Sequence, residues 1–295
     1  MLGTAAAAAA AAATAALYLQ KLKEQIFKNN IINFTMSLSR IEKIVLIGAG
    51  NVATNLALAL KNKDKNIVQI YSHTEKSAKI LGNKIHTSYT TDLNKIVTDA
   101  DLYIVAVTDS SISSVVKNIH LKDNLIVHTS GSVSMEILKH VSSNFGVFYP
   151  LQTFTKTGYL DFDTIPVCIE ANTLKNQEIL SAFAKDLSKY VYVINSEKRK
   201  ILHLSAVFAC NFTNYMYYIA EDILKKYDID FDILRPLIKE TADKIAFNSP
   251  YNAQTGPAIR KDIQTINQHL DLLSYNDDYK KIYDLITGDI MKHTL

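Results

Sequence analysis

Three small residues, Gly48, Gly50 and Ala53, have the types and the spacing that a diphosphate-binding turn requires. Gly48 permits a tight turn, Gly50 lets the backbone approach a diphosphate, and Ala53 lets the following helix pack close to the preceding strand. Backbone N–H groups of Asn51 and Val52 would face the phosphate oxygens. The segment therefore predicts dinucleotide binding. The alternative is a glycine turn in an α/β domain that binds no nucleotide.

The residues after the next strand indicate which dinucleotide would bind. NAD sites usually place Asp or Glu there to bind the ribose 2′-hydroxyl, whereas a 2′-phosphate needs hydroxyl groups and cations. This chain has no acid at the strand tip and instead has Ser72, His73 and Thr74, followed closely by Lys76. We therefore expect NADP, with NAD possible. In the alternative interpretation Thr74 only caps a helix, and His73 and Lys76 are solvated.

Two loops rich in hydroxyl groups follow later strands, at the edge where α/β sheets bind their ligands. In the first loop, Thr108, Asp109 and Ser110 are expected to contact the cofactor. In the second, Ser130 lies beside the flexible Gly131 and is a candidate for contact with the substrate. Ser and Thr also serve as ordinary helix N-caps, which is the alternative for both loops.

A later helix carries polar side chains among Leu, Ala, Val and Phe. At about 100° per residue, Lys200 and Asn211 lie close to one line along this helix, and His203 flanks that line. An imidazole can give or take the proton that accompanies hydride transfer, so His203, or else Lys200, is the candidate acid or base. We expect Asn211 to orient the substrate. The alternatives are a core amide bonded to the backbone and a structural histidine.

The segment Gln254–Asp262, QTGPAIRKD, places Arg260 shortly after a Gly-Pro turn. The chain has only four arginines, and a guanidinium suits a carboxylate or a phosphate on the substrate. Arg260 is therefore a second candidate for orienting the substrate. A structural ion pair, with Asp262 or with a glutamate, is the alternative.

Strand and helix patterns alternate from Lys43 to about residue 195, at the spacing of a doubly wound sheet. The predicted fold class is α/β, a doubly wound Rossmann-type parallel sheet followed by a smaller all-α domain. Pro150 is expected to shape a bent or cis connection, unless it is an ordinary strand end. Strands are expected at 44–47, 66–72, 84–87, 101–107, 125–128, 145–149, 166–170 and 191–194, with helices that include 74–81, 135–141 and 176–189.

These patterns divide the chain into an alanine-rich tail outside the fold (1–36), a dinucleotide-binding domain (37–196) and a helical domain (197–295). The net charge of +3 argues against a nucleic-acid-binding surface. No long uncharged apolar run follows the first twenty residues, so no membrane span is expected, and no Cys or His spacing suits a metal. Cys168 and Cys210 have apolar neighbours, as expected of reduced, buried thiols in a cytoplasm.

These motifs together resemble a family of uncharacterised bacterial proteins in which a Rossmann-like domain precedes a helical domain of unknown function, assigned only in general terms as oxidoreductases. The matching segments are VLIGAGNVATNLALAL, VTDSSI, VHTSGSVSMEIL, FYPLQTF, LHLSAVFACNFTNYMY and QTGPAIRKD. The architecture is similar to that of pyrroline-5-carboxylate reductase, 6-phosphogluconate dehydrogenase and coenzyme F420-dependent NADP reductases. The resemblance implies a homodimer whose helical domains form the interface and close the active-site cleft. Many of these relatives have an asparagine four residues after the helix lysine, where this chain has Leu204.

The sequence therefore predicts a cytoplasmic NADP-dependent oxidoreductase that transfers hydride between nicotinamide and a small polar carbonyl, imine or hydroxy compound. The missing Lys-x-x-x-Asn pair leaves open a second hypothesis, a sensor or scaffold that binds NADP without turning it over. F420-linked NADP reduction shares the fold and is a third.

Overall fold

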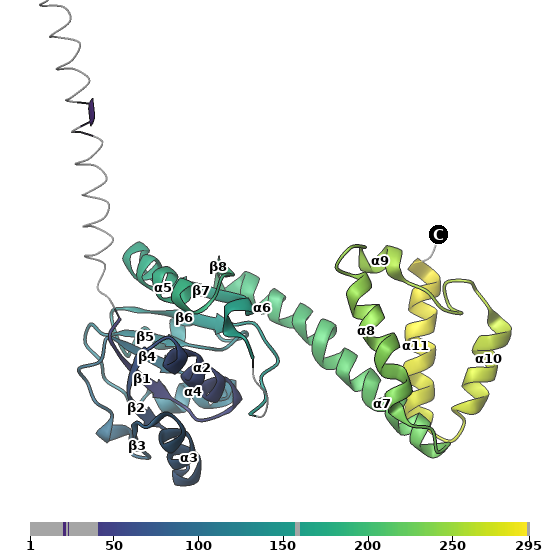
Figure 1. The fold of residues 1–295 in the computed structure, drawn as a ribbon, viewed down its shortest axis with the longest axis horizontal. Helices are drawn as coiled ribbons and strands as arrows, with labels where there is room; N and C mark the ends of the chain where they lie inside the picture. Colours follow the sequence, from purple (N-terminus) through teal and green to yellow (C-terminus); the bar gives the residue numbers. More distant parts are fainter. Residues whose placement is uncertain (1–19, 22, 24–40, 157–159, 294–295) are drawn as a thin grey trace, which may run out of the picture. The chain divides into compact units, whose positions relative to one another are not determined.

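The computed structural model describes residues 20, 21, 23, 41–156 and 160–293 (Figure 1). The predicted alanine-rich tail lies almost entirely outside the described residues. The chain divides into two compact units, of which the first ends at Ala206 and the second begins at Val207.

The first unit is built on an eight-stranded sheet with the strand order β3-β2-β1-β4-β5-β6-β7-β8 (Figure 1). Strands β1 to β6 are parallel, as is the pair β7 and β8. The strands are β1 (Lys43–Ile47), β2 (Asn66–Tyr71), β3 (Ser88–Thr90), β4 (Leu102–Val105), β5 (Leu125–His128), β6 (Phe145–Pro150), β7 (Val167–Ala171) and β8 (Val191–Val193).

The sheet is parallel, as predicted, except at one pair, because strand β7 runs antiparallel to β6. A parallel neighbour needs a crossover connection, usually a helix. The described part of the connection between β6 and β7 holds only a short 3₁₀ turn (Phe162–Thr164), so the chain returns beside β6 in the opposite direction. From β7 the helix α5 (Leu174–Leu187) makes the crossover to β8, and that pair is parallel.

Helices cover both faces of the sheet, as the sequence predicts. In β1, Ile44 and Leu46 belong to one core cluster, whereas Val45 and Ile47 belong to another on the opposite face. Helices α2 (Asn51–Asn62), α3 (Glu75–Ile85) and α5 contribute to the first cluster, and α4 (Asp109–Val116) contributes to the second. Strand β1 is thus buried on both sides, which explains its uninterrupted apolar sequence.

Three local predictions are wrong. Residues 84–87 do not form a strand, because α3 continues to the buried Ile85 and ends at His86, which adopts a left-handed conformation; strand β3 begins at Ser88. The helix predicted at 135–141 is a 3₁₀ turn, Met135–Leu138. Pro150 does not form a cis peptide, since none occurs among the described residues; it is the last residue of β6, paired with Val167.

The second unit is helical, as predicted. It begins with a π-helical segment (Val207–Phe212) that leads into α7 (Thr213–Lys226). After a 3₁₀ turn (Phe231–Leu234), the unit continues with α8 (Arg235–Lys244), α9 (Pro250–Ala253), α10 (Ile263–Leu272) and α11 (Asp277–His293). Within the described residues, no helix is both long and apolar enough to cross a membrane.

The two cysteines differ in their surroundings. Cys168 in β7 is buried, as expected, but Cys210 is exposed, so the prediction of two buried thiols is wrong for the second. Cys210 lies in the π-helical segment, in which no residue is buried. Apolar neighbours in the sequence did not indicate burial there, because those neighbours are themselves exposed.

Candidate functional site

The turn between β1 and α2 has the conformation that the glycine pattern predicts. Gly48 has a φ of +129°, and a Cβ there would lie 2.1 Å from the carbonyl oxygen of Ala106 in the neighbouring strand connection. The Gly48 N–H donates to the carbonyl of Tyr71 at 2.7 Å, which joins the turn to the end of β2. Only glycine fits this position.

Gly50 is the N-cap residue of α2, and no side chain caps this helix end. A Cβ on Gly50 would meet nothing within 4 Å, so the backbone here faces open space. The first turn of α2 holds no acidic residue. The free N–H groups and the positive end of the helix dipole are therefore available to an anion.

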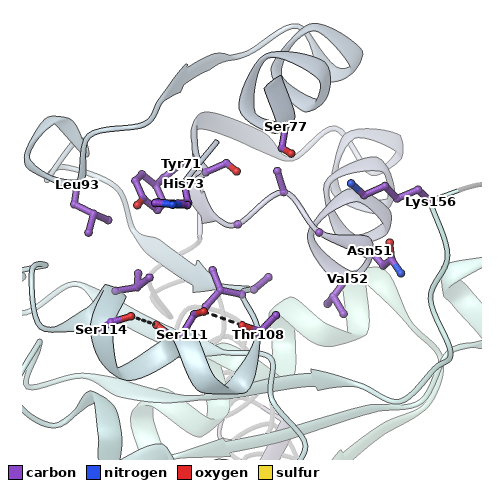
Figure 2. A pocket seen from close by; sticks show the side chains of 17 residues that line it. Asn51, Val52, Tyr71, His73, Ser77, Leu93, Thr108, Ser111, Ser114 and Lys156 are labelled. Carbon is purple, nitrogen blue, oxygen red and sulfur yellow. Dashed lines mark hydrogen bonds between the residues drawn. The ribbon is translucent and has the colours of Figure 1, made fainter. Parts of the chain in front are cut away.

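A cavity of about 770 Å³ opens beside this helix start (Figure 2). Its size suits a small molecule or a cofactor. Helix α4 lines it along one side with three hydroxyl residues, while Asn51 and Val52 lie toward one end of the view and His73 and Leu93 toward the other. The full lining is Gly48, Ala49, Gly50, Asn51, Val52, Tyr71, Ser72, His73, Ser77, Leu93, Ala106, Val107, Thr108, Ser111, Ser114, Val115 and Lys156.

The cavity brings together most, but not all, of the predicted cofactor-binding residues. Ala53 is fully buried in the core, which agrees with the packing role of a small residue at that position. Thr74, Asp109 and Ser110 do not line the cavity, although Thr74 and Thr108 are the N-cap residues of α3 and α4. The predicted cofactor-binding residues that line the cavity are Gly48, Gly50, Asn51, Val52, Ser72, His73 and Thr108.

The described lining contains no acidic side chain, and Lys156 is its one permanently charged residue. Lys156 escaped the sequence reasoning because it reaches the cavity from a loop about a hundred residues downstream of α2. Ser77 and Ser114 were also missed. They lie three and six residues after the N-cap residues Thr74 and Thr108, so helical periodicity beyond each cap was the signal that could have found them.

Asp109 links two loops instead of facing the cavity. Its carboxylate accepts a short hydrogen bond from the hydroxyl of Ser132. In the same loop the buried Ser130 hydroxyl accepts from the N–H groups of Ser132 and Val133 at 3.1 and 3.0 Å. Ser130 therefore stabilises its own turn, and its contact with a substrate stays a prediction.

Arg199, which sequence reasoning missed, holds this loop through hydrogen bonds to two of its carbonyl groups. The side chain is fully buried; its Nε donates to the Ser130 carbonyl at 3.2 Å, and its terminal nitrogens bond to the Val133 carbonyl and the Glu170 carboxylate. The Ser196 hydroxyl and N–H also donate to Glu170, at 2.7 and 2.8 Å. Each nitrogen of the Arg199 guanidinium has a hydrogen-bond partner, so this ion pair fixes the loop after β5 against β7 and α6 (Ser196–Ala206).

His203 forms a pair with a second residue that sequence reasoning missed, Tyr149. The Tyr149 hydroxyl lies 3.1 Å from His203 Nδ1, and the rings meet edge to face. Burial raises the pKa of Tyr149 to about 12, so the phenol stays protonated at neutral pH. Gly131 makes the pair possible, because a Cβ there would lie 2.8 Å from the His203 ring and 2.9 Å from the Tyr149 ring.

His128, at the end of β5, is fully buried beneath the same loop. Its Nδ1 accepts from the Ser130 N–H at 3.2 Å, and its Nε2 has no hydrogen-bond partner among the described residues. Burial, and then the charge of Arg199, lower the pKa of His128 to about 4. The imidazole is therefore neutral at physiological pH and adds no charge to the site.

The remaining predicted site residues are distributed over both units. Lys200 belongs to the first unit and forms an ion pair with Glu197 at 2.9 Å. Asn211 and Arg260 belong to the second unit and are exposed. The line through Lys200 and Asn211 assumed a regular α-helix, and that assumption is wrong because residues 207–212 are π-helical, with more residues per turn.

Two family models match this chain. A Rossmann-like domain matches residues 31–153, and the Domain of unknown function (DUF2520) matches residues 165–290. A comparison with curated proteins gives no match.

Solved structures show a likeness over nearly the whole chain. A protein from Bacteroides fragilis, named as a candidate NADP oxidoreductase, is 45% identical with a TM-score of 0.81, over 87% of this chain and 100% of that one. A protein from Thermotoga maritima is 24% identical with a TM-score of 0.68, over 84% of this chain and 99% of that one. An imine reductase from Myxococcus stipitatus in complex with NADP⁺ is 13% identical with a TM-score of 0.62, over 85% and 93%; at these lower identities the likeness shows the fold alone.

Proposed function

This chain belongs to the family in which a Rossmann-like domain is followed by the domain of unknown function DUF2520, and we propose that it is an NADP-dependent oxidoreductase. Its substrate would be a small polar carbonyl, imine or hydroxy compound. The observation that carries the proposal is the cavity at the uncapped start of α2, which has hydroxyl groups and a lysine in its described lining but no carboxylate. The 45% identical relative named as an NADP oxidoreductase supports the general class, an NAD(P)-dependent reductase.

The described residues fit such a cofactor. The open space above Gly50 would receive the diphosphate, where uncapped N–H groups of α2 can donate to its oxygens. Ser72, His73 and Ser77 line the cavity near the end of β2, where an acid specific for NAD would lie and is absent. The nicotinamide of the bound cofactor supplies or accepts the hydride. The chain supplies position and protons.

We assign the proton transfer to His203, supported by Tyr149. A protonated phenol that donates to Nδ1 leaves the imidazole proton on Nε2, on a side chain that is only partly buried. Nε2 would then donate the proton that the substrate gains during reduction, while the phenol proton of Tyr149 passes to Nδ1 and keeps the imidazole neutral. The phenolate would regain its proton from solvent, because its pKa is about 12. Lys200 is the weaker candidate for this role because its ammonium is engaged by Glu197.

For Ser130, Asn211 and Arg260, a role in orienting the substrate stays a prediction. Asn211 and Arg260 are exposed and able to bond to a ligand's polar groups, and a guanidinium would favour a substrate with a carboxylate or phosphate. The loop that carries Ser130 is held by Arg199 and by Asp109, so its backbone is rigid before any ligand arrives.

We also propose that the protein forms a homodimer through its helical unit. Large apolar side chains are exposed there, among them Phe208, Leu237 and Phe247, the last 90% exposed. Exposed apolar groups of this size are typical of interfaces. Light scattering on the purified protein measures its mass in solution, and a strictly monomeric protein at micromolar concentration would refute this assignment.

The function is tested by NADPH oxidation against a panel of small carbonyl and imine compounds, with cofactor binding measured separately by calorimetry. We expect activity with at least one class of compound. The substitutions His203→Gln and Asn211→Ala should each lower turnover without weakening cofactor binding. Tight NADP binding with no oxidation of NADPH by any compound would instead favour the non-catalytic sensor.

A further inference from the structure

We propose that Lys156 binds a phosphate group of the dinucleotide beside the start of α2. This inference rests on the proposed cofactor site. Lys156 lines the cavity, and Figure 2 shows its side chain on the same side of the cavity as Asn51 and Val52. The glycine turn supplies only backbone N–H groups, so a lysine here would add the one full positive charge that the described lining holds.

The loop that carries Lys156 is fastened to α2 just before this residue. The side-chain amide of Asn51 donates to the Phe154 carbonyl at 2.9 Å, and that of Asn55 donates to the Thr155 carbonyl at 2.7 Å. The Phe154 side chain is buried in the core and stacks on Phe162, with ring centroids 6.3 Å apart. The backbone immediately before Lys156 is therefore held against α2, which places this residue beside the helix start.

The charges around Lys156 favour an anionic ligand. No carboxylate pairs with its ammonium among the residues that the structure describes, and no acid occurs in the described cavity lining. The side chain is exposed, so solvent screens its charge until a ligand covers it. A phosphate oxygen would replace that solvent with a charge-assisted hydrogen bond. Asn51 and Asn55 of α2 thus hold the loop that places Lys156 beside the cavity.

The partner of Lys156 would be either the diphosphate of NADP or its 2′-phosphate. The diphosphate would lie at the start of α2, which is the end of the cavity where Figure 2 shows Lys156. The 2′-phosphate would lie near Ser72 and Ser77. NAD has the diphosphate but lacks the 2′-phosphate, so comparing the two cofactors identifies the group that Lys156 contacts.

The test is calorimetric titration of the full-length protein with NADPH and with NADH, for wild type, Lys156→Gln and Lys156→Arg. Because a charge-assisted hydrogen bond is partly screened at an exposed site, Lys156→Gln should weaken binding by about tenfold. A loss with both cofactors identifies the diphosphate, and a loss with NADPH alone identifies the 2′-phosphate. Lys156→Arg should retain most of the affinity. The matched control is Lys185→Gln, an exposed lysine on α5 outside the cavity lining, and it should bind as wild type does.

A second pair of variants tests the fastening of the loop. Asn55→Leu removes the bond to Thr155, so it should weaken NADPH binding in the wild-type background and have a smaller effect when Lys156→Gln is already present. If wild type binds and Lys156→Gln binds equally well, the assignment of Lys156 is wrong while the cofactor site stands. If wild type binds neither cofactor, both proposals fall together.

Discussion

Replacing Gly50 by alanine should weaken cofactor binding while changing the stability of the free protein only slightly. In the structure a Cβ at Gly50 meets nothing within 4 Å, and its backbone (φ −80°, ψ −166°) is open to any residue. Alanine caps a helix less well than glycine, so we expect Gly50→Ala to cost the free protein about 1 kcal/mol or less. The added methyl group would, however, occupy the space proposed for the diphosphate.

The magnitude follows from linkage between binding and unfolding. A ligand at a hundred times its dissociation constant stabilises the folded state by about 2.7 kcal/mol, and for a domain of this size each kcal/mol moves the melting temperature by about 2–4 °C. NADPH should therefore raise the melting temperature of the wild type by about 5–10 °C. The same concentration should raise that of Gly50→Ala by less than about 2 °C, if the methyl group costs most of the affinity.

The assay is thermal unfolding with and without NADPH, and the matched control is Gly288→Ala. A Cβ at Gly288 also meets nothing within 4 Å, but this residue lies in α11, away from the cavity lining. The control should keep the full NADPH-dependent shift. If Gly50→Ala also keeps the full shift, the diphosphate does not lie against Gly50 and the reasoning fails.

Three further predictions concern the loop after β5 and the residues that contact it. Gly131→Ala should push the His203 ring away by about 0.6 Å to reach ordinary contact, and so lower turnover by about tenfold or more while NADPH affinity stays unchanged; a normal kcat would contradict this. Arg199→Met leaves the largely buried Glu170 carboxylate, 12% exposed, without its charge partner and should cost about 3 kcal/mol in urea unfolding, and a loss below about 1 kcal/mol would show that the pair is dispensable. His128 has a pKa lowered from 6.5 to about 4 in the folded protein, so its contribution is fully present above pH 6.5 and is lost as the pH falls toward 4. Between pH 7 and pH 5 the wild type should lose about 2 kcal/mol more stability than His128→Asn, and equal pH dependence of the two proteins would refute that pKa.

Structure that depends on residues close together in the chain could be predicted from the sequence. The strand, turn and helix around Gly48 and Gly50 are determined by residues within one short segment, and the structure agrees with the pattern there. The strand predicted at 84–87 failed because Ile85 satisfies a helix face as well as a strand, and burial against the sheet decided for the helix.

The residues that sequence reasoning missed depend on contacts between distant parts of the chain. Tyr149 meets His203 across 54 positions, Arg199 reaches the Ser130 carbonyl across 69, and the loop before Lys156 meets Asn51 across 103. No periodicity encodes such contacts. One clue was present, since the scarcity of arginine drew attention to Arg260, and the same scarcity applied equally to Arg199.

The antiparallel strand β7 has a practical consequence for anyone who shortens this protein. The boundary between the two family models falls at 153–165, between β6 and β7, yet β7 and β8 belong to the same sheet as β1, and α5 connects those two strands. A fragment cut at that boundary would present the edge of β6 unpaired and would lack the Arg199 and Glu170 supports, so we expect it to aggregate. The family models divide the chain between β6 and β7, whereas the compact units of the structure divide it after Ala206.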